Sequence, residues 1–203
     1  DRMDDFLEYI SRLPGQLLWS EMKENALGAT ENKDGGAMKF LKLLLDKISG
    51  DDSYEIHLIG HSAGSIFLAP VISYLTSSNE KLRGTAIESC TLWAPACTVD
   101  MFLEYYKPAV ENKSIKDFNL YTLTDKAELD DNCAGIYNKS LLYLVSNAFE
   151  SIPRIPVTLP YGTPVFGMEK FIDPSYWNDD ELKKINNSGM RKNFEINRNN
   201  AKI

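Results

Sequence analysis

The fold is decided by residues 54–75, which read YEIHLIGHSAGSIFLAPVISYL. The first part of this stretch carries Ile56, Leu58 and Ile59 and predicts a strand buried on both of its faces. The second part, residues 65–75, is apolar and long enough to predict a buried helix. Pro70 either kinks that helix or lies in its tolerant first turn. The stretch therefore predicts a strand, a short glycine-rich turn and a helix in succession.

The turn between the strand and the helix is Gly60-His61-Ser62-Ala63-Gly64, a G-x-S-x-G motif. In that context the motif predicts a nucleophile elbow, a tight turn that lifts the hydroxyl of Ser62 out of the backbone. We expect both glycines to be required because a larger side chain would clash with a neighbouring strand or helix. The motif indicates acyl transfer by an activated serine, and the alternative interpretation is a turn without chemistry.

The composition is that of an ordinary globular protein and excludes several classes of partner. The chain has 203 residues, of which 43% are hydrophobic and 25% charged, which suits one domain with a sizeable core. The net charge of −7 and the lack of a basic stripe argue against nucleic acid and anionic membranes as partners. No apolar stretch has the length of a membrane span. The three cysteines, Cys90, Cys97 and Cys133, lack metal-ligand spacing and favour a reducing, cytoplasmic compartment.

The chain divides into three parts within a single predicted domain, residues 1–203. Residues 1–50 form a helical lead-in, with a break at Pro14-Gly15, a loop at 28–36 and a helix at 37–48. Residues 51–150 form the elbow and the sheet core, with further strands at 86–94 and 118–123, a polar loop at 77–83 and helices at 100–110 and 140–149. Residues 151–203 are rich in proline, with a short helix at 179–185 and a final strand at 193–197. Alternating strands and helices predict an α/β fold with a mainly parallel sheet flanked by helices.

A serine nucleophile needs a base, a carboxylate that orients the base, and N–H donors for the oxyanion. The backbone N–H of Ala63 is one candidate donor. A second donor should come from a loop after an earlier strand, and no suitable strand precedes residue 50. Asp125, at the end of the third strand, is the candidate acid, although a solvated turn residue is the competing interpretation. Asp100 is the alternative acid, and Asp130 and Asp131, which more readily cap or flank a helix, come after it.

The chain offers no evident histidine base. It contains only His57 and His61, and no histidine follows the serine as the order of serine, acid and histidine requires. We expect the His61 side chain to point away from the reacting carbonyl and His57 to pack against a helix. We interpret both histidines as structural.

Five stretches carry a resemblance to a known family: WSEMKENA (19–26), HLIGHSAGSI (57–66), LTDKAELDD (123–131), SLLYLVSNA (140–148) and GTPVFGM (162–168). The chain resembles the α/β-hydrolase superfamily and, more closely, bacterial α/β-hydrolase-like proteins of uncertain substrate. The resemblance covers nearly the whole chain, and only the elbow motif is specific for chemistry. It implies an oxyanion loop of the His-Gly-Gly type before Asp1 and a catalytic histidine at or beyond Ile203. The chain is therefore expected to be an internal fragment, with its sheet incomplete at both ends.

These observations predict a serine hydrolase that acts on an ester or related acyl bond of a small molecule. Ser62 is the nucleophile, Asp125 the acid and Ala63 the oxyanion donor, while the base lies outside the chain, which alone should be inactive. The alternative, motivated by the missing histidine, is a noncatalytic α/β-hydrolase-fold protein for binding or assembly. A cysteine enzyme is a third hypothesis, because Cys97 and Cys133 lie in loops near sheet edges. No cofactor or metal motif is visible, and the sequence does not specify the oligomeric state.

Overall fold

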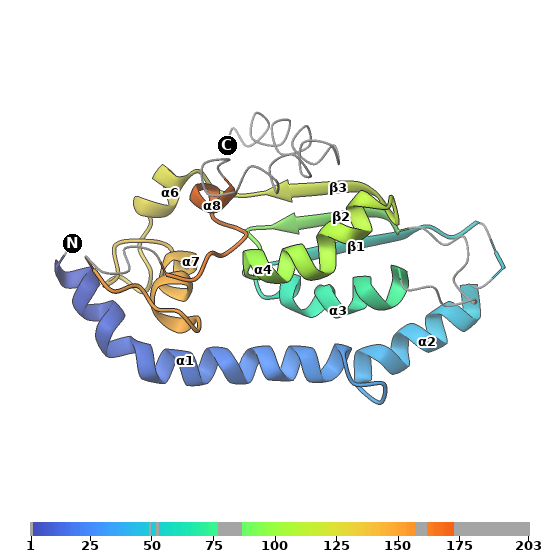
Figure 1. The fold of residues 1–203 in the computed structure, drawn as a ribbon, viewed down its shortest axis with the longest axis horizontal. Helices are drawn as coiled ribbons and strands as arrows, with labels where there is room; N and C mark the ends of the chain where they lie inside the picture. Colours follow the sequence, from blue (N-terminus) through green and yellow to red (C-terminus); the bar gives the residue numbers. More distant parts are fainter. Residues whose placement is uncertain (1, 49, 52, 77–86, 157–161, 173–203) are drawn as a thin grey trace.

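A computed structural model describes residues 2–48, 50–51, 53–76, 87–156 and 162–172, and they contain a three-stranded parallel sheet (Figure 1). The strands are β1 (Ile56–His61), β2 (Ile87–Trp93) and β3 (Ile115–Tyr121), in the spatial order β1-β2-β3. The register places His61, Trp93 and Tyr121 at the same level across the sheet. The predicted α/β class with a parallel sheet flanked by helices is confirmed, although β3 begins and ends earlier than the sequence predicted.

One face of the sheet is covered by two helical segments that the sequence predicted. The first is α3 (Gly64–Thr76), which follows the elbow and continues through Pro70 beyond its first turn. The second is a continuous run of α4 (Val99–Met101), the π-helical turn η2 (Phe102–Tyr106) and α5 (Lys107–Glu111). This run begins where the Thr98 side chain accepts a hydrogen bond from the Met101 N–H.

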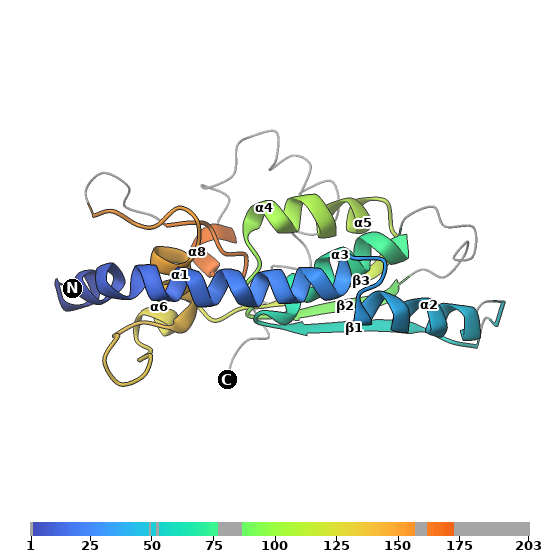
Figure 2. The ribbon, with the colours of Figure 1, turned by 90° about the horizontal axis from the view of Figure 1, so that it is seen from below.

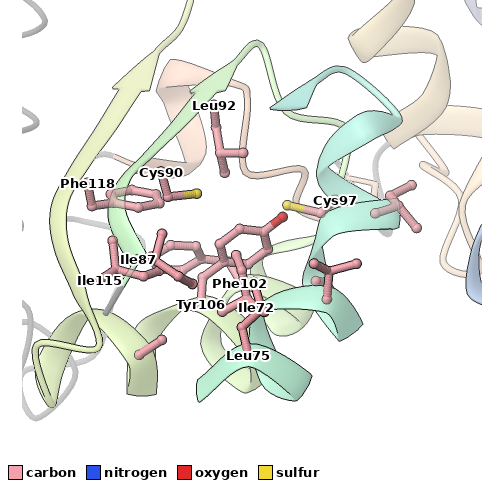
Figure 3. Packing of buried hydrophobic residues seen from close by; sticks show 14 of the residues in the cluster. Ile72, Leu75, Ile87, Cys90, Leu92, Cys97, Phe102, Tyr106, Ile115 and Phe118 are labelled. Atoms are coloured by element: carbon pink, nitrogen blue, oxygen red, sulfur yellow. The ribbon is translucent and has the colours of Figure 1, made fainter. Parts of the chain in front are cut away.

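The main core lies between the sheet and these two helical segments (Figure 3). Aromatic rings of η2 fill its centre, and the Phe102 ring stacks on Phe166 with centroids 3.8 Å apart. The Tyr106 hydroxyl is buried but donates a 2.5 Å hydrogen bond to the Ser65 carbonyl. That contact ties the core to the first turn of α3, directly after the elbow.

The opposite face of the sheet is open at β1. The side chains of His57, Ile59 and His61 alternate along the strand and are exposed, whereas Gly60 is buried. The prediction of a strand buried on both faces is therefore wrong. Within the described ranges, helices pack against only one face of the sheet, and the apolar composition of the strand does not indicate this.

The long helix α1 (Arg2–Thr30) runs along the outside of the molecule, and α2 (Gly36–Ile48) follows it (Figures 1 and 2). The predicted break at Pro14-Gly15 is wrong, because both residues lie inside one continuous helix. Proline removes one backbone hydrogen bond from a helix. Here the helix continues through Pro14, and Gly15 is buried against the ring of Phe149, where a side chain would clash. The predicted loop is correspondingly shorter, and the predicted helix at 37–48 is confirmed.

The remaining described elements are short and lie near the carboxyl end of the sheet. They are α6 (Asp125–Leu129), α7 (Leu141–Leu144) with the π-helical turn η3 (Val145–Phe149), and α8 (Glu169–Ile172). The α7–η3 segment confirms the helix predicted at 140–149. The loop predicted at 77–83, the helix at 179–185 and the strand at 193–197 lie outside the described residues. Among the described helices, none combines the length and apolarity needed to cross a bilayer.

Candidate functional site

Ser62 occupies the strained turn that its motif predicts. Its φ of +50° lies in the left-handed region, which non-glycine residues rarely adopt. The Ser62 N–H donates to the Trp93 carbonyl at 3.0 Å, and the Ser62 carbonyl accepts from the Ala96 N–H at 3.0 Å. The Ser65 hydroxyl donates to the same carbonyl at 2.7 Å. These bonds to β2 and α3 hold the backbone of Ser62 in its conformation.

The two glycines of the motif have different roles. A Cβ atom on Gly60 would lie 2.9 Å from Leu68 Cδ1 and 3.0 Å from Leu92 Cδ2, so this glycine permits the close approach of β1, β2 and α3. A Cβ atom on Gly64 would meet nothing within 4 Å. The expected clash is therefore confirmed for Gly60 and wrong for Gly64.

Acyl transfer at the elbow would use the Ser62 hydroxyl and the Ala63 N–H. Among the described residues, no acceptor bonds the Ala63 N–H and no partner bonds the half-buried Ser62 hydroxyl. Ala63 immediately precedes α3, a helix of 13 residues whose N-terminus carries partial positive charge. An oxyanion that forms beside Ser62 would meet an unoccupied donor and a favourable helix dipole.

Asp125 follows the third strand and begins α6, where the Thr124 side chain accepts a hydrogen bond from Ala127 N–H. The Tyr143 hydroxyl donates to Asp125 Oδ1 at 2.6 Å, and the Asp125 N–H donates to Glu169 Oε2 at 2.8 Å. Since β2 separates β1 from β3, the ends of these two strands lie about 10 Å apart. Ser62 and Asp125 thus follow the carboxyl ends of strands in one sheet, and no hydrogen bond joins the two side chains.

Lys170 adds a cation beside this carboxylate. A bridge between Leu123 and Met168 brings the start of α8 to the end of β3. The Lys170 Nζ lies 4.0 Å from the centroid of the Tyr143 ring. Burial lowers the pKa of Lys170 to about 8, against the attraction of Asp125, which favours the ammonium. Sequence reasoning missed Tyr143 and Lys170 as neighbours of Asp125, because neither stands at a motif spacing from it.

The other candidate acids are less enclosed than Asp125. Asp100 lies exposed in the first turn of α4. Asp130 and Asp131 are exposed at the end of α6, and Asp131 Oδ1 accepts only from the N–H of the next residue. Of these four carboxylates, Asp125 alone is half-buried and bonded by a side chain from another helix.

Neither histidine bonds to Ser62. His57 Nδ1 lies 2.8 Å from Ser89 Oγ, and its Nε2 lies 3.3 Å from Glu55 Oε2. The expectation that His57 packs against a helix is wrong, because it is exposed on the open face of the sheet. It lies five residues before Ser62, about 16 Å along an extended strand. His61 is exposed on the same face.

Two of the three cysteines, Cys90 and Cys97, are buried in the core. Burial raises the pKa of both Cys90 and Cys97 to about 12, which keeps these thiols protonated. Cys133 is half-buried. Within the part of the chain that the structure describes, no group of three side chains has the composition and proximity to hold a metal ion.

Comparison of the chain with protein-family models, with curated proteins and with solved structures finds no match.

Proposed function

We propose that Ser62 is the nucleophile of a serine hydrolase that acts on an ester or a related acyl bond. One observation carries the proposal: Ser62 adopts φ +50° between a parallel strand and a helix, and its hydroxyl is uncommitted. Strained backbone of this kind persists only where surrounding contacts impose it, and it concentrates at functional sites. The serine conformation, the strand order and the position of Asp125 support an α/β-hydrolase-like domain.

The proposed reaction begins when Ser62 Oγ attacks the carbonyl carbon of the substrate and its proton passes to a base. The Ala63 N–H stabilises the resulting oxyanion, and collapse releases the alcohol and leaves an acyl-serine that water hydrolyses. Because neither of the chain's two histidines bonds to Ser62, we infer that the base comes from outside these 203 residues. Asp125 orients it through Oδ2, since Tyr143 already bonds Oδ1.

The test is hydrolysis of p-nitrophenyl esters of increasing acyl length by the native protein that contains this chain. Ser62→Ala should lower kcat/KM by at least about 10³-fold, and Asp125→Asn by about 10³- to 10⁴-fold. Ser73→Ala is the matched control, because Ser73 is exposed on α3, and it should leave the rate unchanged. Full activity in folded Ser62→Ala would refute the proposal.

The second candidate function is a noncatalytic binding or assembly role. The observation that favours it is that His57 and His61 are exposed on the open face of the sheet and that neither bonds to Ser62. If the native protein is folded and hydrolyses none of the esters, this second function accounts for the elbow better than the first.

A further inference from the structure

In the first part of α1, apolar side chains face outward and acidic side chains face the rest of the protein. An ordinary surface helix has the opposite arrangement. Between residues 3 and 18, every exposed side chain is apolar. Seven of these side chains are 49–71% exposed, and we call them the α1 stripe: Met3, Phe6, Tyr9, Ile10, Leu13, Leu17 and Leu18. Contiguous apolar surface of this extent marks an interaction site in a soluble protein.

The inward face of the same helix is polar, and its partners fix the orientation of the helix. Glu8 is only 3% exposed and accepts five hydrogen bonds, which come from Tyr137, Lys139, Asn147 and Arg154. Rotating α1 to bury its stripe would expose this carboxylate and leave the buried donors unpaired, which is costly. The outward position of the stripe is therefore imposed by specific contacts.

A second buried carboxylate holds the middle of α1 in the same orientation. Glu150, which follows η3 and is 2% exposed, accepts from Trp19 Nε1 at 2.6 Å and from Lys23 Nζ at 2.8 Å. In the view from below, α1 lies in front of the other described elements (Figure 2). Phe6, Leu13 and Leu17 of the stripe remain 57–71% exposed in the described part of the chain.

The spacing of the stripe is that of a helix-pairing surface. Met3, Phe6, Ile10, Leu13 and Leu17 follow one another at alternating intervals of three and four residues. This is the a and d pattern by which two helices interlock, here over about 21 Å of helix. This spacing therefore favours another helix, and not a flat surface, as the partner of the stripe.

We propose that the α1 stripe pairs in antiparallel fashion with the α1 stripe of a second copy of this chain. A two-fold axis would place Phe6 opposite Leu17 and Ile10 opposite Leu13, so that one patch complements itself. If each of the seven side chains buries about 100 Å², each copy contributes about 700 Å², close to the ~800 Å² per partner of a stable interface.

The charges around the stripe favour antiparallel pairing over parallel pairing and over binding to a membrane. Exposed Arg2 precedes the stripe, and exposed Glu21 and Glu24 follow it, so antiparallel pairing brings opposite charges together at both ends. A helix that lies on a membrane carries a basic polar face, whereas the other face of α1 presents Glu8 to the protein interior. The pairing does not depend on the chemistry of Ser62.

The test is the molar mass of the 203-residue chain by sedimentation equilibrium between 1 and 100 µM. The wild type should reach twice its 22.9 kDa mass, and Leu13→Glu should weaken association at least 100-fold. Leu43→Glu is the matched control, because Leu43 on α2 is exposed to the same 71% and the charge change is identical. A wild type that remains monomeric at 100 µM, including one that instead binds phosphatidylcholine vesicles, overturns the proposal.

Cross-linking tests the antiparallel direction separately, in a Cys133→Ser background. An oxidised mixture of the Phe6→Cys and Leu17→Cys variants should form a disulfide-linked dimer, whereas each variant alone should not. Efficient cross-linking of either variant with itself would indicate parallel helices and contradict the proposed arrangement. Circular dichroism on every variant separates loss of pairing from loss of folding.

Discussion

Replacing Glu8 by alanine should destabilise the protein severely, because this carboxylate holds α1 to the rest of the fold. It accepts five hydrogen bonds, including two from the Arg154 guanidinium at 3.0 and 2.8 Å. Removing one partner of a buried ion pair costs about 3–5 kcal/mol, mainly because the remaining charge has no counterpart. The lost hydrogen bond of the buried Tyr137 hydroxyl adds to this cost.

The measurement is urea unfolding followed by circular dichroism. With a slope of about 3 kcal/mol per molar urea, the expected loss lowers the midpoint by about 1–1.7 M. Glu8→Gln should fall between the wild type and Glu8→Ala, because its amide oxygen still accepts but carries no charge. Glu24→Ala removes an exposed carboxylate from the same helix and should stay within about 0.5 kcal/mol.

Self-association would add a concentration-dependent stability term, so these variants are compared in the Leu13→Glu background. The contrary outcome is a Glu8→Ala variant whose free energy of unfolding stays within about 1 kcal/mol of its parent. That result would mean that the contacts of Glu8 do not fix the orientation of α1.

Three further predictions concern side chains near the sheet. Lys170 should titrate near pH 8 by NMR. Asp125→Asn should lower the pKa of Lys170 further, because it removes the attraction that favours the ammonium. An unchanged pKa in this variant would contradict the proximity of Lys170 to Asp125. Because the folded-state pKa is depressed, this lysine makes stability rise with pH from about 8 to its unfolded value near 10.4. Of the three thiols, only Cys133 should react with a disulfide reagent before unfolding, since Cys90 and Cys97 are buried and have pKa values of about 12. Rapid reaction of all three thiols in the folded protein would contradict the packing. Gly60→Ala should cost about 1–3 kcal/mol by thermal unfolding, because its new methyl group meets two leucine side chains, and a neutral result would refute the tight fit.

The elbow could be predicted from the sequence because its determinants are local. A strand, a tight turn and a helix follow from the residues of one short stretch, and the strain at Ser62 belongs to that turn. The helices α2 and α3 could likewise be predicted from the spacing of their apolar residues.

What the sequence could not supply depends on contacts between distant residues. Within the continuous helix α1, Gly15 follows Pro14 and packs against Phe149, a residue far along the chain that the local sequence does not reveal. The same limit applies to Asp125, whose hydroxyl donor Tyr143 lies on another helix. The exposure of His57 depends on which face of the sheet the helices cover, and the alternation of one strand does not determine that.

The apolar spacing at the start of α1 shows a further limit. It correctly predicted a helix, but apolar periodicity normally marks the face that packs inward. Here the inward face carries Asp4 and Glu8, which are 2% and 3% exposed. Only their partners in the folded chain reveal that the apolar face points outward.

Covalent labelling is the most direct test of the proposal that Ser62 is an activated nucleophile. The native protein would be treated with a fluorophosphonate probe, digested and mapped by tandem mass spectrometry. We expect one phosphonylated residue, Ser62, with labelling abolished in Ser62→Ala and retained in Ser73→Ala. Absence of labelling in the folded native protein, or labelling that survives Ser62→Ala, would contradict it.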